Sequence, residues 1–401
     1  MATKEKFLFL EPLRGIFALA IVIAHGNYIG KSSFLLNDNI MLQNGPMLID
    51  MFFQLSGFVI AYSYVERVNN LSSAVVFQFN RFLRMYPLHF VTFLLFALGF
   101  PLIEYLFEVF WGGVRGIRPF SDFDALDFFN NVFLLQGIFT DNISYNYPSW
   151  SVSVEFYTYA IFALVLTLFA SDISRIFASV LLVIIAGYAL YLTDSRYPET
   201  GMALFRCMYS FFIGVLVYYI YSNFTIRVAP IFVYLSIILM LVCWYFGNYI
   251  SSLVTPFTCT FIFLSLLWTE MSGLKKFLNN SKLVILGTIS YGIYMIHAAV
   301  WYVMGRILMK FFDYQLVQEP RTGDWIVAVE PTLATILLVL GTGLTVVLAY
   351  LNIWKCRLTG MRSKCLRLPR KPERWKNIRW SIKSQTAIRK GWFPPLWIIL
   401  L

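Results

Sequence analysis

The sequence predicts an all-α integral membrane protein, with about ten transmembrane helices in one bundle and both termini on the cytoplasmic side. Of its 401 residues, 59% are hydrophobic and only 13% are charged, whereas a soluble domain carries roughly 25% charged residues. Long apolar segments recur along the chain, and about 20 mostly apolar residues cross the core of a bilayer. Lipid therefore replaces water around most of the protein surface.

Ten segments carry an apolar run of about the length that a spanning helix needs. They are residues 9–29, 47–65, 86–108, 150–170, 175–193, 203–221, 228–247, 252–269, 284–311 and 332–354. No small-residue cleavage site follows the first run, so we expect it to be retained as a span. Residues 1–354 then form one transmembrane domain, and residues 355–401 form a cytoplasmic tail.

The charges of the connecting segments orient the bundle. With a cytoplasmic N-terminus, Lys and Arg concentrate in the inner loops and Asp and Glu in the outer loops, as the positive-inside rule requires. The inner residues are Arg67, Arg81, Arg84, Arg227, Lys275, Lys276 and Lys282, and the outer residues are Asp122, Asp124, Asp127, Asp141, Asp194, Glu199, Glu319 and Asp324. The longest outer connection, residues 109–149, suggests a lid or part of an acceptor site.

The tail holds the positive charge of the chain. Residues 355–401 contain thirteen Lys or Arg and one acid, Glu373, so the tail has a charge of +12 and the remainder a charge of −1. A basic tail beside a membrane is suited to anionic lipid, and we do not expect nucleic acid as a partner. The five cysteines show no CxxC pair and no metal-ligand spacing, which predicts no disulfide and no metal site.

Two ionisable residues lie in the first predicted span, where each is costly in lipid and is therefore a functional candidate. Arg14 and His25 are eleven residues apart. At 100° per residue they are offset by only about 20° after three turns, with a rise of about 16 Å. A polar stripe therefore runs from Arg14, near the cytoplasm, to His25 beyond the bilayer midplane. The alternative for His25 is a packing residue with one hydrogen bond.

Arg81 and Arg84 form a second candidate group, at the cytoplasmic end of the third predicted span. Their spacing of three places them on one face of a helix. Arginine pairs of this kind hold phosphates through forked hydrogen bonds. The alternative is ordinary basic flanking charge at the inner membrane surface.

The fourth span begins with WSVSVE at residues 150–155. Trp150 suits the outer aromatic belt, but Glu155 does not suit a lipid-facing position. Ser151 and Glu155 share a helix face because they are four residues apart. The alternative for Glu155 is a buried structural carboxylate that is neutral or paired with an arginine.

The ninth span carries SYGIYMIH at residues 290–297. Ser290 and His297 are seven apart and share one face, which forms another polar stripe. We assign Tyr291 and His297 to the binding surface for substrate and donor. The third histidine, His89, is interpreted as a local hydrogen-bonding residue.

Together these segments resemble the acyltransferase family 3 of membrane proteins, which includes O-antigen, exopolysaccharide and nodulation-factor acetylases. In family order, the matching pieces are Leu13-Arg14-Gly15 with His25, FFQLSGF at 52–58, Arg81-x-x-Arg84 with Pro87, WSVSVE and SYGIYMIH. The resemblance covers residues 8–354. Glu11 departs from the Asp that many members have three residues before the arginine. The last span also lacks the acid-x-Pro-x-Arg signature with which it ends in many members.

The resemblance implies a membrane O-acyltransferase that moves an acyl group, most often acetyl, from cytoplasmic acyl-CoA to a hydroxyl of a carbohydrate or glycoconjugate. Acyl-CoA is then a co-substrate, and no cofactor stays bound. Arg81 and Arg84 would hold its phosphates at the inner face, and Arg14 would line the entrance. The carbohydrate or glycolipid acceptor and the membrane lipids complete the expected partners, and the oligomeric state is left open.

In this mechanism His25 is the general base, because an imidazole titrates near neutral pH. Glu155 would orient the imidazole or stabilise its charged form. Ser151, Tyr291 and the Trp150 indole are the candidate donors to the oxyanion. An acyl-histidine intermediate is an alternative to direct transfer.

The alternative function is a polytopic transporter of protons or of a glycoconjugate, because intramembrane His, Glu and Arg also mark proton relays. A transporter would favour inverted repeats or paired broken helices, and neither is visible in the sequence. We expect a multi-pass protein of the bacterial cytoplasmic membrane.

Overall fold

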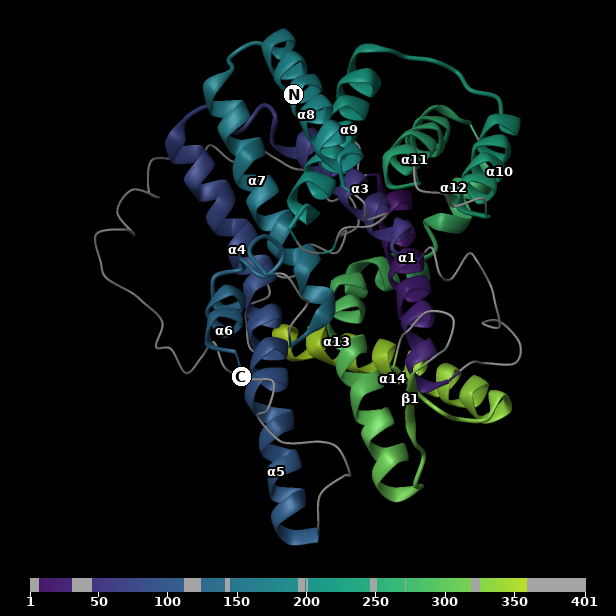
Figure 1. The fold of residues 1–401 in the computed structure, drawn as a ribbon. Coiled ribbons are helices and arrows are strands. Elements are labelled where there is room, and N and C mark those ends of the chain that lie inside the picture. The colour runs from purple at the N-terminus through teal and green to yellow at the C-terminus, as the bar shows by residue number, and fades with distance from the viewer. Residues whose placement is uncertain are drawn as a thin grey trace. The chain divides into compact units, whose positions relative to one another are not determined.

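A computed structural model describes residues 7–30, 45–111, 124–140, 145–193, 199, 201–245, 251–270, 272–318 and 325–358. The chain divides into two units, Met1–Tyr350 and Leu351–Leu401. The first unit is a bundle of helices, shown in Figure 1. The predicted lid segments 112–123 and 141–144, and nearly all of the basic tail, lie outside the described residues.

The helices and strands occur in the following order. They are η1 (Leu8–Leu10), α1 (Glu11–His25), η2 (Gly26–Ile29), α3 (Met47–Tyr64), α4 (Leu71–Leu94), the π-helix η3 (Leu95–Gly99), α5 (Phe100–Trp111), α6 (Ala125–Val132), η4 (Tyr147–Ser149), α7 (Trp150–Leu168), α8 (Asp172–Tyr191), α9 (Ala203–Asn223), α10 (Ile231–Tyr245), α11 (Ser251–Trp268), α12 (Ser272–Leu278), α13 (Ser281–Phe311), β1 (Leu316–Gln318), β2 (Trp325–Val327) and α14 (Pro331–Leu358). The two strands pair antiparallel.

The all-α membrane fold is confirmed. Among the described residues, eight helices are long and apolar enough to cross a membrane. The predicted spans at 228–247 and 252–269 correspond to shorter apolar helices, Ile231–Cys243 and Leu253–Trp268. The first of these is about 20 Å long at 1.5 Å per residue, which is less than the roughly 30 Å of a hydrocarbon core. The structure therefore supports eight of the ten predicted spans by length.

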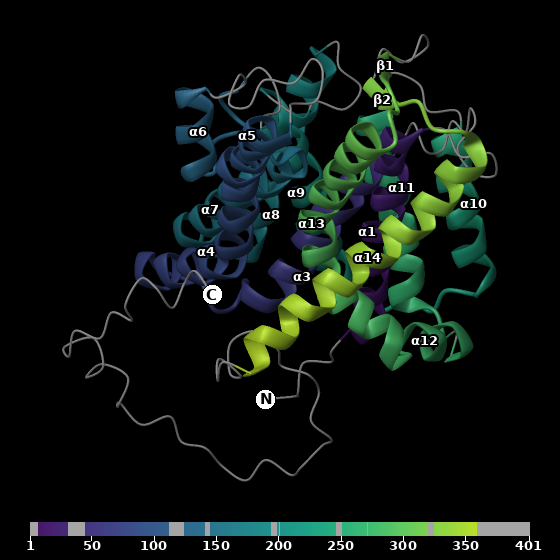
Figure 2. The same cartoon turned by 90° about the horizontal axis from the view of Figure 1, so that it is seen from below.

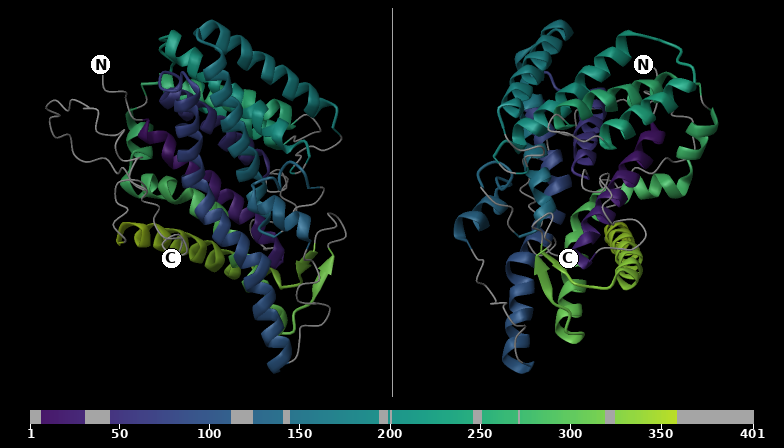
Figure 3. Two further views of the ribbon diagram at one scale, coloured as in Figure 1. Left: turned by 90° about the vertical axis from the view of Figure 1, so that its left-hand side faces the viewer. Right: turned by 45° about the vertical axis from the view of Figure 1, so that its right-hand side comes forward.

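The third span is longer than the sequence predicted. Instead of beginning near residue 86, one helical segment extends over Leu71–Phe110, and Figure 3 shows α4 and α5 as one continuous rod. Asn70 begins this helix with a capping box to Ser73, which satisfies free backbone groups in its first turn. Pro87 lies inside α4 and costs one backbone hydrogen bond without ending the helix. Arg81 and Arg84 are therefore inside a helix and not at its end.

Two pairs of helices form the centre of the bundle. Residues of α1 pack against α13 and residues of α3 against α9. Figure 2 shows α1, α3 and α13 between α4–α8 on one side and α10–α12 on the other. The contacts are closest at glycines. A Cβ atom at Gly287 would lie 2.0 Å from the carbonyl oxygen of Glu11, and one at Gly214 would lie 2.0 Å from that of Gln54. Small residues thus let the backbones touch, as in other membrane helix pairs.

The close packing sets α1 and α13 in parallel. Gly15 meets Gly287 near the start of both helices, and Tyr28 meets Gly305 farther along. Between them the Trp301 indole donates a hydrogen bond to the Val22 carbonyl, 3.2 Å away. Residues at equal depth in α1 and α13 therefore face each other.

A buried ion pair joins α3 to α9. Arg206 Nε lies 2.8 Å from Asp50 Oδ1, and both side chains are 0% exposed. The same guanidinium donates to the Pro46 carbonyl at 2.6 Å and lies over the ring of Trp150. The charge of Arg206 is therefore balanced by the Asp50 carboxylate, a backbone carbonyl and an aromatic ring. A buried charge needs partners of this kind.

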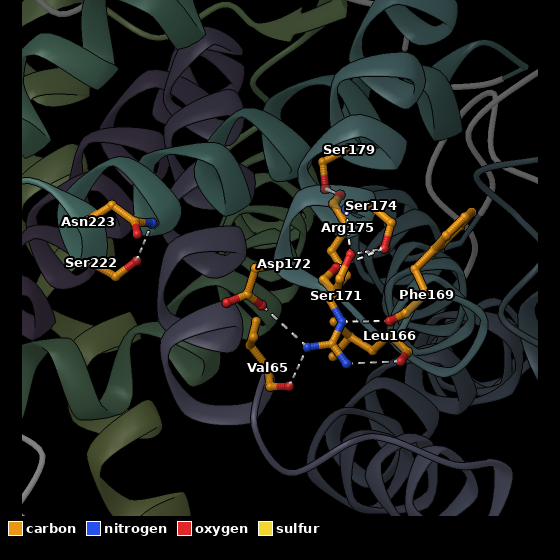
Figure 4. A network of polar contacts seen from close by, with 10 residues as sticks. All are labelled: Val65, Leu166, Phe169, Ser171, Asp172, Ser174, Arg175, Ser179, Ser222 and Asn223. Carbon is orange, nitrogen blue, oxygen red and sulfur yellow. Dashed lines mark hydrogen bonds and ion pairs between the residues drawn. The ribbon is translucent and has the colours of Figure 1, made fainter.

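Arg175 ties three helix ends together, as Figure 4 shows. Its guanidinium donates to the carbonyls of Phe169 and Leu166 at the end of α7 and to the Val65 carbonyl at the end of α3. It also forms an ion pair with Asp172 at 3.6 Å. A cation that donates to terminal carbonyls satisfies backbone groups that a helix end leaves free.

Candidate active site

Polar side chains from α1, α3, α4, α7 and α13 gather in three groups at different depths of the bundle. The arginine cluster is Arg14, Arg81 and Arg84. The carboxylate cluster is Ser56, Glu155 and Tyr159. The histidine cluster is His25, Tyr147 and His297.

The histidine cluster joins three separate parts of the chain. His297 Nε2 lies 3.2 Å from His25 Nδ1 and 3.1 Å from the Tyr147 hydroxyl. The two imidazole rings are stacked, with centroids 5.1 Å apart. On its other side, His297 Nδ1 lies 2.6 Å from the carbonyl oxygen of Tyr294. The parallel packing of α1 and α13 (Figure 1) places these rings at one depth.

Residues around the cluster hold its members in place. Asn146 precedes Tyr147 and donates hydrogen bonds to Thr92 at 2.9 Å and to the Met295 carbonyl at 3.2 Å. This anchors the short helix η4 between α4 and α13. His297 itself is 0% exposed. The ring geometry is therefore set by packing and hydrogen bonds before any ligand binds.

Glu199 lies outside the spans and is a charged neighbour of Tyr147 and Tyr294. Burial raises the pKa of its carboxyl group, although the charge of Arg206 opposes that effect. The carboxyl therefore keeps a proton over a wider pH range than an exposed glutamate does.

Glu155 is placed differently from the sequence prediction. Its Oε1 atom accepts hydrogen bonds from the hydroxyls of Ser56 at 2.6 Å and Tyr159 at 2.5 Å. It makes no hydrogen bond to His25 in the described part of the chain. The physical reason is depth, because Glu155 follows Tyr147 by about two helical turns, or roughly 12 Å. The imidazole of His25 instead contacts the rings of His297 and Tyr147.

The candidate oxyanion donors are distributed over two levels. Ser151 Oγ lies 2.9 Å from the Tyr294 hydroxyl, one turn before His297. Tyr291 donates to the Met85 carbonyl at 2.6 Å and has Glu155 as a charged neighbour. Trp150 is 2% exposed and packs toward Arg206, so the structure does not bring its indole to the histidines.

The arginine cluster is brought together from two helices. The charged neighbours of Arg84 on α4 include Arg14 of α1, Arg81 and Glu11. Arg81 donates to the Tyr64 hydroxyl at 3.0 Å. Arg84 is exposed and Arg14 half-buried, and among the described residues neither has a hydrogen bond or an ion pair. Free guanidinium groups held close together against their mutual repulsion are suited to a polyanionic ligand.

A further ion pair joins α13 to α5. Arg306 Nε is 2.8 Å from Glu104 Oε1, and the Tyr302 hydroxyl donates to the same oxygen at 2.6 Å. Tyr302 also stacks on Phe100 with a centroid distance of 4.7 Å. These contacts pack α5 against α13. The pairing was not predicted, although Glu104 and Arg306 are ionisable residues inside predicted spans.

The side chains that could bind a metal ion do not form a candidate metal site among the described residues. Within the described residues, no group of three or more His, Cys, Asp or Glu side chains converges as a metal site requires. Cys207, Cys243 and Cys259 are free thiols.

Two residues of the site, Tyr147 and Ser56, were not predicted from the sequence. Tyr147 lies in η4, just before the Trp150 segment, and its role depends on a contact with a residue 150 positions away. Ser56 belongs to the FFQLSGF segment, so the family motif did contain a signal for it. Within that motif, Ser56 supports the carboxylate of Glu155 through a hydrogen bond.

The sequence family described as an acyltransferase domain, the acyltransferase family 3, matches residues 7–352. The chain belongs to this family and is therefore a membrane-embedded acyltransferase. No solved structure matches it.

Two curated proteins are similar to the chain. The acyltransferase MdmB of Streptomyces mycarofaciens is 26% identical over 326 residues, which are 73% of this chain and 78% of that protein. Protein 2 in the picA locus of Rhizobium radiobacter is 34% identical over 98 residues, which are 24% of this chain and 47% of that protein. The first similarity extends across most of the helix bundle.

Proposed function

We propose that this acyltransferase moves an acyl group, with acetyl as the first choice, from cytoplasmic acyl-CoA to a hydroxyl of a carbohydrate or glycoconjugate. The observation that supports this most is the separation of two features along α1. Arg14 belongs to a cluster of guanidinium groups without full compensation, and His25 belongs to a histidine cluster about 16 Å farther along the helix. A ligand with an anionic head and a reactive end at some distance from it matches this arrangement.

Coenzyme A has both properties. Its phosphates would bind the exposed guanidinium of Arg84 together with Arg14 and Arg81, through forked and charge-assisted hydrogen bonds. Its thin pantetheine arm would pass between α1 and α7 and bring the thioester to His25. The basic residues of the inner loops support entry from the cytoplasm.

The chemical step needs one base and one or more oxyanion donors. The acceptor hydroxyl attacks the thioester carbonyl, and His25 takes its proton while the new C–O bond forms. The C–S bond then breaks, and the leaving thiolate of coenzyme A takes the proton from His25. The hydroxyls of Ser151 and Tyr294, which lie 2.9 Å apart one helical turn from His297, are candidate donors to the oxyanion. An acyl-histidine intermediate differs only in the first nucleophile, and a burst of coenzyme A release without acceptor distinguishes it.

We also propose the class of acceptor and the membrane in which the protein lies. A hydroxyl-bearing carbohydrate or glycolipid would reach the histidine cluster from the side opposite the arginines, at the outer face of a bacterial cytoplasmic membrane. The outer connection 109–149 would then border its approach. A protein that moved such a glycoconjugate without acyl chemistry would need no acyl-CoA, and this separates the two functions.

The test compares two histidine variants in cells. Surface glycans from cells with the wild-type protein, the His25→Ala variant and the His89→Gln variant are analysed by mass spectrometry for an acyl group. His89 is a matched control, because among the described residues its Nε2 has one hydrogen-bond partner, the Asn131 carbonyl at 2.9 Å, and a glutamine amide can donate in its place. We expect the acyl group to disappear with His25→Ala and to persist with His89→Gln.

Binding of the donor is measured separately. Isothermal titration of the purified protein with acetyl-CoA should show binding in the wild type and in the His25→Ala variant alike. Full acylation by a correctly inserted His25→Ala protein would contradict the catalytic role. A wild-type protein that binds no acyl-CoA would favour the transport function.

A further inference from the structure

The tautomer of His297 follows from its surroundings. Nδ1 of His297 lies 2.6 Å from the carbonyl oxygen of Tyr294, and a carbonyl oxygen can only accept a hydrogen bond. Nδ1 therefore carries a hydrogen atom. The ring is 0% exposed and has no acidic partner among the described residues, so a second proton would be an uncompensated buried charge. Nε2 of His297 consequently holds a lone pair.

The tautomer of His25 follows in turn. Nδ1 of His25 lies 3.2 Å from Nε2 of His297, and because two facing lone pairs would repel, one of these two nitrogens donates. The Tyr147 hydroxyl, 3.1 Å from the same Nε2, is a second donor to its lone pair. Because Nε2 of His297 has the lone pair, Nδ1 of His25 carries the hydrogen. The carbonyl of Ile21, one turn earlier in α1, is a further acceptor at the same ring. In the neutral ring of His25, the lone pair is then on Nε2.

We infer that His297 is a positioning residue that holds His25 in the tautomer whose Nε2 atom is the base. This inference rests on the proposed acyl transfer, and it replaces both the substrate-binding role predicted for His297 and the orienting role predicted for Glu155. When Nε2 of His25 takes the proton of the acceptor hydroxyl, the bond from Nδ1–H to His297 becomes charge-assisted and stronger. His297 thus has the part that a carboxylate has in hydrolase triads, without placing a negative charge in the membrane.

The inference has a spectroscopic signature that does not depend on activity. The chain contains three histidines, so ¹⁵N,¹³C-histidine labelling of the full chain in lipid bilayers gives few signals, which single variants assign. We expect Nδ1–H tautomers for His25 and His297. His89 should show the Nε2–H tautomer, because its Nε2 faces the carbonyl of Asn131.

Two substitutions separate positioning from packing. In His297→Gln the amide oxygen takes the place of Nε2 and can still accept from His25, whereas His297→Leu fills similar volume without an acceptor. His297→Leu should perturb the Nδ1–H signal of His25 and lower kcat for acyl transfer by on the order of 10²-fold, the usual range for a misplaced general base. His297→Gln should keep the signal and stay within about tenfold of wild-type kcat. The KM for acyl-CoA should change in neither variant.

Each outcome bears on one claim. An unchanged His25 spectrum and full kcat in His297→Leu would overturn the inference, and would show that the Ile21 carbonyl alone fixes the ring. Equal loss of kcat in both variants, with an unchanged His25 spectrum, would also overturn it, since only packing would then be involved. A wild-type protein with the expected spectrum but no reaction with acyl-CoA would contradict the proposed function and leave the hydrogen bond between the histidines standing.

Discussion

Arg206 and Arg84 are intramembrane arginines in opposite electrostatic situations. Arg206 is fully buried, paired with Asp50 and bonded to a backbone carbonyl. Arg84 is exposed and has two other arginines among its charged neighbours. A charge that is compensated inside the protein stabilises a particular packing, whereas a charge that is left uncompensated is available to a ligand. The sequence shows two similar residues, and only their surroundings separate a structural from a functional role.

Removal of Arg206 should have the largest effect on stability. Arg206→Met leaves the Asp50 carboxylate buried without a partner, which costs about 3–5 kcal/mol. We expect a large fall in the melting temperature of the detergent-purified protein, followed by a thiol-reactive or tryptophan fluorescence probe. The double variant Asp50→Leu with Arg206→Met should recover most of the loss, because it removes both charges. A single variant as stable as the wild type would show that the pair contributes nothing to the fold.

Substitution in the arginine cluster should affect binding and leave stability intact. Arg84→Gln removes one charged hydrogen-bond donor, worth about 1.5–3 kcal/mol, so the dissociation constant of acyl-CoA should rise roughly 10- to 100-fold. The melting temperature should not fall, since among the described residues the guanidinium has no hydrogen bond to lose, and its removal relieves repulsion with Arg14 and Arg81. Isothermal titration with acetyl-CoA gives the first quantity and thermal denaturation the second.

Arg67→Gln provides the matched control for that experiment. Arg67 is exposed just beyond α3 and also belongs to the predicted inner loops, but it is not among the charged neighbours of Arg84. Loss of affinity of the same size in both variants would mean that general positive charge, and not the cluster, attracts the donor.

The features that the sequence predicted correctly are those that one helix contains. The apolar runs located the membrane helices, and the spacing of Arg14 and His25 placed both on one face of α1 because helical periodicity is a local property. The start of α4 at Leu71 was missed, since Arg81 and Arg84 interrupt the apolar run and Pro87 normally marks a helix start. The capping box of Asn70 and the buried packing of Phe77 stabilise these helical turns despite the hydropathy pattern.

Contacts between helices could not be predicted in the same way. His25 and His297 are separated by 272 positions, and the glycines that bring α1 against α13 show no pattern that names their partner. Glu155 was predicted to orient His25 by analogy with triads, in which a third group orients the base. The structure gives it the hydroxyls of Ser56 and Tyr159 instead, and this difference in depth is a property of the assembled bundle.

Arg175 is compensated less completely than Arg206 and more completely than Arg84. Its substitution should cause the smallest change in free energy of the three, counting binding and stability together. Its guanidinium is largely buried and donates to carbonyls from two helices, while its ionic partner Asp172 is exposed. Arg175→Lys keeps the charge but not the planar fork, so one or two of those hydrogen bonds are lost at about 1 kcal/mol each. The melting temperature should fall by a few degrees, while acetyl-CoA affinity stays unchanged. Asp172→Asn should have an even smaller effect, because the exposed half of an ion pair contributes little. If Asp172→Asn proved the more damaging of the two, the ion pair and not the capping of α3 and α7 would be what Arg175 supplies.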